Sequence, residues 1–297
     1  MTGADARPVA IDAPAKVNLY LHITGRRGDG FHTLDSLIAF AAPFDRISVA
    51  EAPALSLDIS GPFAPALHNA SEPNLVETAA RHLAALAEMA GIAPGAHITL
   101  DKQLPVAAGI GGGSSDAAAA LRALVALWGL TLDPAALAAL ALSLGADVPM
   151  CLYGRTCFAG GIGEIIDPAP TLPDCALLLV NPGVSLATPD VFRARQGNFS
   201  APARFEQAAR DGQDLAEILA ARGNDLEAPA TALAPVIGET LAALNALPGC
   251  RLARMSGSGA TCFALFDDDA VAADGADSLR ARHSGWWIVP SRFVQAN

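Results

Sequence analysis

The stretch Pro105-Val-Ala-Ala-Gly-Ile-Gly-Gly-Gly-Ser-Ser-Asp-Ala117 carries the strongest structural signal in the chain. Its glycines allow backbone N–H groups to turn toward a common point. The Ala- and Leu-rich run that follows, as far as Trp128, predicts a helix that starts at the same point. Because N–H groups and a helix N-terminus both attract negative charge, the stretch predicts a loop that holds an anion such as phosphate.

Two well-known phosphate loops do not fit this stretch. A Walker A loop needs Lys and Ser or Thr directly after its last glycine, and Ser114-Ser115-Asp116 stands there instead. A dinucleotide-binding fingerprint needs a glycine or alanine at the position of Ser114 and an acidic residue at the end of the next strand. A loop that only caps the helix, with Ser114 or Ser115 as the N-cap, remains the alternative.

A lysine and an aspartate, Lys16 and Asp147, are the candidate catalytic residues of the sequence. Residues 16–23 alternate between polar and apolar, so Lys16 and Asn18 share one face of a strand, about 6.6–6.8 Å apart. The chain has 17 arginines but only two lysines, Lys16 and Lys102. Asp147 follows a predicted helix, and a carboxylate beside a lysine can orient or deprotonate a hydroxyl group. Taken singly, a strand-edge charge and a turn residue remain the simpler interpretations.

Aromatic residues accompany a second glycine-rich loop, Gly25-Arg-Arg-Gly-Asp-Gly-Phe-His32. Phe31 and His32 lie within it, and Phe192 follows a predicted helix start at Thr188-Pro189. Aromatic faces in such places can stack on a flat base, although a loop anchor is the simpler interpretation for each residue alone.

The order of elements predicts an α+β fold with two domains. Strands are expected at 16–23, 46–51, 55–59, 96–101, 176–180, 251–255, 261–266 and 286–289. Helices are expected from Ser71 to Gly91, from the glycine stretch to Trp128, from Asp133 to Gly145 and over most of 225–247. The proline cluster at 167–173 predicts a boundary that separates residues 1–168 from residues 169–297. The order of the stretch 198–223 stays open.

Composition excludes several classes of protein. With 297 residues, 52% of them hydrophobic, the chain can bury a core and is not intrinsically disordered. A net charge of −11 without a Lys/Arg run argues against nucleic-acid binding, so an anionic substrate needs a local site. Five cysteines without a Cys-x-x-Cys pair argue against disulfides and zinc, and the histidines show no metal-ligand spacing. No apolar run is long enough for a membrane span, and the first eight residues lack a leader pattern, so we expect a cytoplasmic protein.

Three motifs, Ala13-Pro-Ala-Lys-Val-Asn-Leu19, the 105–117 stretch and Met255-Ser-Gly-Ser-Gly-Ala260, resemble the three ordered motifs of the GHMP small-molecule kinases. The segments 28–33, 144–149 and 188–192 resemble those members that act on a cytidylylated substrate. The resemblance implies an N-terminal ATP-binding α/β domain with the catalytic residues, residues 1–168, and a sandwich-like substrate domain, residues 169–297. It also implies ATP-dependent phosphorylation, with Mg²⁺, of the 2-hydroxyl of cytidine-diphosphate methylerythritol in the non-mevalonate isoprenoid pathway.

The resemblance further implies a role for each matching residue. Asp147 is the expected general base and Lys16 its charge partner. Substrate contacts are expected from Asn18, Phe31, His32, Thr188 and Phe192, with the cytosine read by His32 between the two phenylalanines. ATP contacts are expected from Pro105, Ala107, Gly109, Gly111, Gly112, Gly113, Ser114, Ser115 and Asn74. No residue is identified as a Mg²⁺ ligand. Family members commonly carry Tyr in place of Phe31, which keeps the stacking face, and some have glycines in place of Ala107 and Ala108.

Two other functions stay open. A GHMP kinase acting on mevalonate, homoserine or a sugar would share the phosphate loop, and the aromatic loop argues for a base-containing substrate instead. A nucleotide-binding regulator without turnover would need neither Lys16 nor Asp147. The expected partner is a small molecule, and both a monomer and a homodimer are compatible with the sequence.

Overall fold

A long antiparallel hairpin organises the N-terminal half of the chain. In a computed structural model that describes residues 8–68 and 73–294, β1 (Val9–Arg26) pairs with β2 (His32–Ala50) along its whole length. The strands expected at 16–23 and 46–51 are parts of this hairpin. The sequence underestimates β2 because residues 37–41 form a continuous apolar run that is buried on both faces, without the alternation of polar and apolar residues. For β1, it finds only the part that alternates.

Further strands extend this sheet. β4 (His97–Asp101) pairs with the end of β2 and with β3 (Ser56–Ser60), and β5 (Cys157–Gly161) pairs with the start of β2 and with β6 (Ile165–Pro168). The short helix α1 (Ala64–His68) follows β3. The glycine-rich turn between β1 and β2 therefore lies at the end of β2 that pairs with β5, away from the end that pairs with β4.

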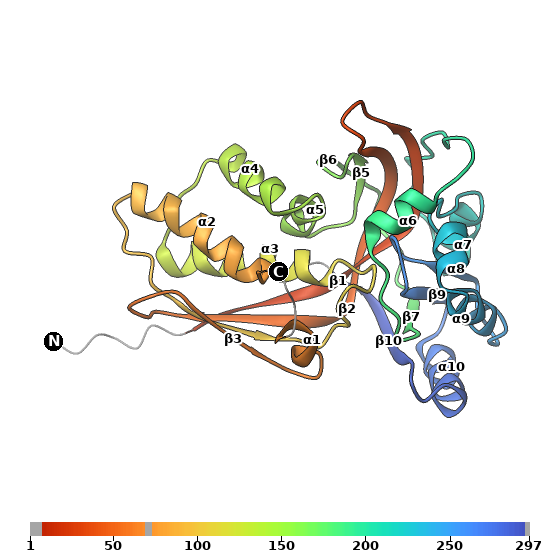
Figure 1. The fold of residues 1–297 in the computed structure, drawn as a ribbon. Coiled ribbons are helices and arrows are strands. Elements are labelled where there is room, and N and C mark those ends of the chain that lie inside the picture. Colours follow the sequence, from red (N-terminus) through yellow and green to blue (C-terminus); the bar gives the residue numbers. More distant parts are fainter. Residues whose placement is uncertain (1–7, 69–72, 295–297) are drawn as a thin grey trace.

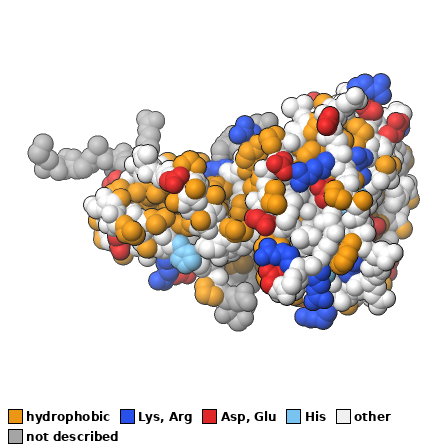
Figure 2. Space-filling view, turned by 90° about the horizontal axis from the view of Figure 1, so that it is seen from above, with side chains coloured by type: hydrophobic (Ala, Val, Ile, Leu, Met, Phe, Trp, Pro, Cys, Tyr) orange, Lys and Arg blue, Asp and Glu red, His pale blue; other side chains and the backbone are white. Residues whose placement is uncertain are grey.

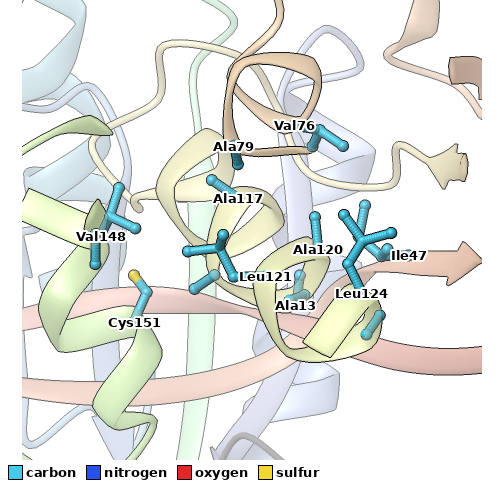
Figure 3. Close-up of a cluster of buried hydrophobic side chains, with 14 of the residues drawn as sticks. Ala13, Ile47, Val76, Ala79, Ala117, Ala120, Leu121, Leu124, Val148 and Cys151 are labelled. Carbon is cyan, nitrogen blue, oxygen red and sulfur yellow. The ribbon is translucent and has the colours of Figure 1, made fainter. Parts of the chain in front are cut away.

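Four helices cover one face of this sheet (Figure 1): α2 (Leu75–Met89), α3 (Gly112–Trp128), α4 (Pro134–Leu144) and α5 (Val148–Tyr153). The central helix α3 buries Ala117 and Ala120 beside Leu121 (Figure 3). Small side chains let α3 approach both the strands and α2 closely, and Ala is also the residue that favours helix most. The Ala bias of the sequence thus supports a tightly packed layer on which the phosphate loop rests.

The C-terminal half continues the same sheet. β7 (Ala176–Asn181) lies between β9 (Cys262–Phe266) and β10 (Trp287–Val294), and β8 (Leu252–Met255) completes the order β3-β4-β2-β10-β7-β9-β8. The helices of this half are α6 (Thr188–Ala194), α7 (Gly212–Ala220), α8 (Glu227–Leu233), α9 (Val236–Asn245) and α10 (Asp269–Arg282). The mixed content of helix and strand confirms the α+β fold. The division between residues 168 and 169 stays a prediction, and β10 pairs across it with β2.

Helix ends follow the sequence signals closely. Asp133 caps α4 by accepting a hydrogen bond from the N–H of Ala135 at 3.0 Å, and Gly129 ends α3 with a φ of 61°. Asn74 is the N-cap of α2. The expected start at Ser71 lies outside the described residues, as do residues 1–7, on which the expectation of no leader rests.

Surface charge is mixed on the face seen in Figure 2, where basic side chains of the described residues lie beside acidic ones. Across residues 8–68 and 73–294, we find no helix with the length and hydropathy that a membrane span requires. The middle segments of β1 and β2 are buried between the N-terminal and C-terminal halves of the molecule.

Candidate active site

A cavity of about 960 Å³ lies where the N-terminal hairpin, the phosphate loop and α6 meet. Most of the predicted site residues line it: Lys16, Asn18, Phe31, His32, Ala107, Gly109, Gly111, Gly112, Gly113, Ser114, Asp147, Thr188 and Phe192. These residues come from segments up to 176 positions apart in sequence, Lys16 to Phe192, so the fold gathers them into one place.

Lys16 and Asp147 form an ion pair in this cavity. The Nζ atom of Lys16 lies 3.0 Å from Oδ2 of Asp147 and donates a hydrogen bond to Oδ1 of Asn18 at 2.8 Å. The lysine side chain is 5% exposed, and the aspartate side chain is 41% exposed. The lysine is therefore fixed in the wall, and the carboxylate remains open to a ligand. The predicted sharing of one face by Lys16 and Asn18 is confirmed.

Asn18 connects the three sequence motifs. Its backbone N–H donates to the hydroxyl of Ser256 at 3.1 Å, and that hydroxyl donates to the carbonyl of Gly109 at 3.0 Å. Its side-chain amide donates to the hydroxyl of Ser36 at 2.8 Å. The loop after β8 thus holds the phosphate loop against β1, which explains why a glycine- and serine-rich segment near the C-terminus belongs to the site.

The phosphate loop has a backbone that only small residues fit. Gly109 and Gly111 have φ values of 75° and 61°. A Cβ atom on Gly109 would lie 2.6 Å from the carbonyl oxygen of Gly259, and one on Gly111 would lie 2.9 Å from Cε of Lys16. Glycine avoids both the strain of a positive φ and these clashes. Ala107 also has a positive φ, 52°, without being glycine.

The helix after the loop starts earlier than a serine cap would require. Gly111 is the N-cap of α3 and no side chain caps the helix, so the alternative with Ser114 or Ser115 as the N-cap is wrong. The uncapped N–H groups of the first turn are available to an anion. Ser114 lines the cavity, whereas Ser115 is buried, donates its hydroxyl to the carbonyl of Pro14 at 2.8 Å, and lines neither cavity described here.

A smaller cavity of about 250 Å³ adjoins the other side of the phosphate loop. Asn74 and Pro105 line this smaller cavity and not the larger one, and Ala107, Gly112 and Gly113 line both. The side-chain oxygen of Asn74 accepts a hydrogen bond from the N–H of Val76 at 2.8 Å. The phosphate loop thus lies between the larger and the smaller cavity and lines both.

The aromatic end of the large cavity contains a ring pair. The rings of His32 and Phe192 stack with centroids 5.3 Å apart and an interplanar angle of 28°, and Phe31 is 60% exposed beside them. Burial lowers the pKa of His32, and the charges of Arg26 and Arg195 lower it further. A neutral imidazole has one donor and one acceptor nitrogen, which suits it to read a polar base edge.

Sequence reasoning missed the basic lining and the role of the second lysine. Arg26, Arg193 and Arg195 line the large cavity together with Lys16. Among the described residues, Asp147 is the one acidic side chain in that lining. The cavity is therefore positive within a chain whose net charge is −11. With 17 arginines in the chain, composition does not distinguish these three from the others, whereas the two lysines stand out by their rarity.

Lys102 is buried beneath the phosphate loop. Its Nζ atom lies 2.5 Å from Oδ2 of Asp45 and 2.6 Å from Oδ2 of Asp116, and a Cβ on Gly112 would lie 3.1 Å from it. Lys102, which directly follows β4, thus links β2 and α3 under the loop.

The described residues offer few ligands for a metal ion. Among residues 8–68 and 73–294, no group of three His, Cys, Asp or Glu side chains could hold one. Asp147 and Ser114 both line the large cavity. Mg²⁺ in phosphoryl-transfer sites takes one or two carboxylates together with substrate phosphates and several waters. This donor set fits a magnesium ion that arrives with a nucleotide.

Comparison with known proteins agrees with the geometry of the site. The family model "GHMP kinases N terminal domain" matches residues 74–155, and the model "GHMP kinases C terminal" matches residues 205–285. A protein of Paramagnetospirillum magneticum named 4-diphosphocytidyl-2-C-methyl-D-erythritol kinase is 52% identical over 96% of this chain and 98% of its own. A protein of Cereibacter sphaeroides with the same name is 54% identical over 95% of this chain and 98% of its own.

Solved structures agree on the fold. A crystal structure of 4-(cytidine 5'-diphospho)-2C-methyl-D-erythritol kinase, 36% identical, superposes with a TM-score of 0.77 over 96% of this chain and 99% of that one. A homoserine kinase from Cytophaga hutchinsonii, 16% identical, shares the fold with a TM-score of 0.71 over 100% of this chain and 97% of that one. With two matching family models and relatives above 50% identity over nearly its whole length, the chain belongs to the GHMP kinase family of small-molecule kinases.

Proposed function

We propose that this kinase transfers the γ-phosphoryl group of ATP to the 2-hydroxyl of 4-diphosphocytidyl-2-C-methyl-D-erythritol, a step of non-mevalonate isoprenoid synthesis. One observation carries the proposal: a single cavity joins a phosphate loop, a Lys–Asp pair and a stacked His–Phe pair. The names of the relatives above 50% identity support it. Mevalonate and homoserine contain no base, so neither has a group that would stack on the aromatic residues of the cavity.

In this proposal Asp147 accepts the proton of the substrate hydroxyl or holds that hydroxyl for attack. Its open carboxylate supports this role, and the ammonium of Lys16, 3.0 Å away, lies where it can offset negative charge on the transferred phosphoryl group. Asn18 holds Lys16 in place and contributes to the wall beside the reacting hydroxyl. Phosphoryl transfer depends on positioning and charge stabilisation, and these groups supply both.

The nucleotide is expected to straddle the phosphate loop. The N–H groups of residues 109–115 and the N-terminus of α3 would surround the phosphates. Asn74 and Pro105 line the smaller cavity, which would take the nucleoside. Mg²⁺ would offset the charge of the phosphates, with Asp147 and Ser114 as its protein ligands or as partners of its bound waters.

The cytidine is expected at the other end of the large cavity. Phe31 and Phe192 would stack on the two faces of the base, and His32 would read its polar edge. Because Phe192 already stacks on His32, the base would enter beside that pair and meet the exposed ring of Phe31 last. Thr188, whose hydroxyl lies 2.9 Å from that of Ser258, would approach the substrate diphosphate.

A coupled assay for ADP release tests the proposal. The protein with ATP and Mg²⁺ is offered the cytidylyl substrate, mevalonate and homoserine in parallel. We expect turnover with the cytidylyl substrate alone. Turnover with another of the three, or ATP binding without any turnover, would overturn the proposed substrate.

The Phe31→Ala variant then tests the aromatic end. Because Phe31 is 60% exposed, its truncation leaves the core intact, and stacking on a base contributes about 1–3 kcal/mol. We expect the KM for the cytidylyl substrate to rise by about 5- to 160-fold on that basis and the KM for ATP to stay within about twofold. Equal changes in both values would contradict stacking by Phe31.

A further inference from the structure

Arg195 is a buried cation in the wall of the large cavity that no role described above uses. It is the residue directly after α6, its side chain is 7% exposed, and it lines the cavity together with Phe192 and His32. By contrast, the side chain of Arg193 is 74% exposed and is paired with Asp190. The two arginines thus differ in how firmly the fold fixes them.

The surroundings of Arg195 hold its guanidinium group in one place without neutralising it. Nη1 donates to the carbonyl of Gly197 at 3.3 Å, Nη2 donates to the carbonyl of Asn198, and the group lies 5.1 Å from the ring centroid of Phe199. Carbonyl dipoles and an aromatic face orient a guanidinium but leave its charge uncompensated. The geometry is therefore that of a preorganised positive charge.

The carboxylate nearest to this charge is engaged elsewhere. Oδ2 of Asp225 lies 4.0 Å from Nη2 of Arg195, at the outer limit of an ion pair. That same oxygen accepts from the N–H of Ile23 at 2.7 Å, and Oδ1 accepts from the hydroxyl of Ser200 at 3.0 Å. Asp225 links the segment after α6 to β1, and it only partly offsets the positive charge of Arg195.

The hydrogen-bonding capacity of Arg195 is also incompletely used. Nε is buried and has no acceptor among the described residues. A guanidinium group carries five N–H bonds, and two of them are used in the bonds to Gly197 and Asn198. A buried donor without a partner is destabilising, and such a donor in a native site calls for an explanation.

The charge of Arg195 reaches the interior of the cavity. Besides burial, it is one of the two cations that lower the pKa of His32, Arg26 being the other. The cavity lining holds three guanidinium groups, from Arg26, Arg193 and Arg195, of which that of Arg193 is paired with Asp190. Asp147, the acidic side chain of the described lining, pairs with Lys16 instead. A ligand that carries negative charge next to its base would compensate this excess.

We propose that Arg195 binds the diphosphate of the substrate and thereby holds the bound molecule between the aromatic pair and the Lys16–Asp147 pair. The ligand class is a nucleoside diphosphate ester, and the inference rests on the proposed function. A fixed, desolvated guanidinium loses little conformational freedom on binding and acts strongly on an anion, since water does not screen it. The exposed side chain of Arg193 would contribute less to binding of the diphosphate.

Competitive inhibition by CDP and by cytidine separates the diphosphate from the base. In Arg195→Gln we expect the inhibition constant of CDP to rise by about tenfold or more, as for the loss of a charged hydrogen-bond partner. We expect that of cytidine to stay within about twofold. Arg195→Lys keeps the charge without the planar fork and should recover part of the preference for CDP. The matched control is Arg210→Gln, which removes an 80% exposed arginine outside both cavities and should leave both constants unchanged.

Each outcome decides the matter. An equal loss of CDP and cytidine binding would assign Arg195 a merely structural role, and unchanged CDP binding would show that its charge does not act on the ligand. Should Arg195→Gln fail to fold, Arg195→Lys carries the test, because a CDP preference equal to that of the wild type would overturn the planar contact. Wild-type protein that neither binds CDP nor turns over the cytidylyl substrate would refute the proposed function itself, which distinguishes the two failures.

Discussion

At the scale of single residues, Asp147 has the features of a group kept free for chemistry. It follows α4 and directly precedes α5, its carboxylate is 41% exposed, and its one ion-pair partner among the described residues is Lys16. Pro149 in the first turn of α5 fixes the backbone next to it. A side chain in such a position contributes little to the core, so its replacement tests function rather than folding.

We therefore predict that Asp147→Asn lowers kcat by about 10²-fold or more, because the amide can neither accept the hydroxyl proton nor carry charge. The Kd of ATP measured without Mg²⁺ should stay within about threefold, since the phosphate loop is unchanged. Single-turnover kinetics and calorimetric titration with ATP measure the two quantities. Asp277→Asn, which alters a 76% exposed aspartate paired with Arg280, is the matched control. A kcat close to that of the wild type would remove Asp147 from the reaction.

At the scale of elements, the phosphate loop is shaped by contacts on both of its sides. The loop after β8 packs so closely against Gly109, and the side chain of Lys16 on β1 so closely against Gly111, that neither position has room for a Cβ atom. We predict that Gly111→Ala lowers kcat/KM at least about tenfold, because the new methyl group displaces Lys16 and strains a backbone with a φ of 61°.

Gly285→Ala is the matched control for this change, because a Cβ at Gly285 meets open space. Circular dichroism should show the same helix content for both variants. If Gly111→Ala keeps full activity, the close approach of the loop to Lys16 is not needed for catalysis.

The support beneath the loop comes from the buried group of Lys102, Asp45 and Asp116. Burial raises the pKa of Asp116, and the nearby charge of Asp45 raises it further, while Lys102 opposes both. Two backbone N–H groups, of Gln103 at 2.6 Å and Leu104 at 2.8 Å, donate to Asp45. One lysine thus compensates two buried carboxyl groups, and the cluster depends on it.

We predict that Lys102→Met lowers the free energy of unfolding by about 3–5 kcal/mol, the usual cost of leaving buried charge without its partner. Urea denaturation measures this value. Adding Asp116→Asn should recover part of the loss, because it removes one of the two carboxyl groups that the lysine faces. A double variant that is no more stable than Lys102→Met alone would contradict this coupling.

At the scale of the whole molecule, four of the five cysteines of the chain are buried. Burial raises the pKa of Cys157 and of Cys175 to about 12, and it also raises the pKa of Cys151 and Cys262. All four are free thiols. In the unfolded chain they ionise near the ordinary value of 9.0, so the folded state binds more protons at alkaline pH.

Folding stability from these thiols is therefore complete below about pH 9 and is lost as the pH rises toward about 12. We predict a loss of about 1 kcal/mol per thiol between pH 8.5 and 10. Urea denaturation at both values measures it in a reducing buffer. In the double variant Cys157→Ala, Cys175→Ala the fall should be about 2 kcal/mol smaller than in the wild type, since two of these thiols are gone. An unchanged fall would assign the alkaline loss to other groups.

The local features of this protein follow from short stretches of its sequence. Helix ends at Gly129 and Asp133, the glycine stretch 109–113 and the shared face of Lys16 and Asn18 follow from short-range rules of backbone conformation and side-chain period. The resemblance of three motifs added the family, which the comparisons confirm.

Only the tertiary structure decided which distant residues meet. It brought Asp147 to Lys16, stacked Phe192 on His32, placed Lys102 under the phosphate loop and left Arg195 partly uncompensated in the wall. Such contacts depend on strand order and on packing between the halves of the molecule. Local sequence patterns report the conformation of neighbouring residues, and they do not report which surface a folded segment will face.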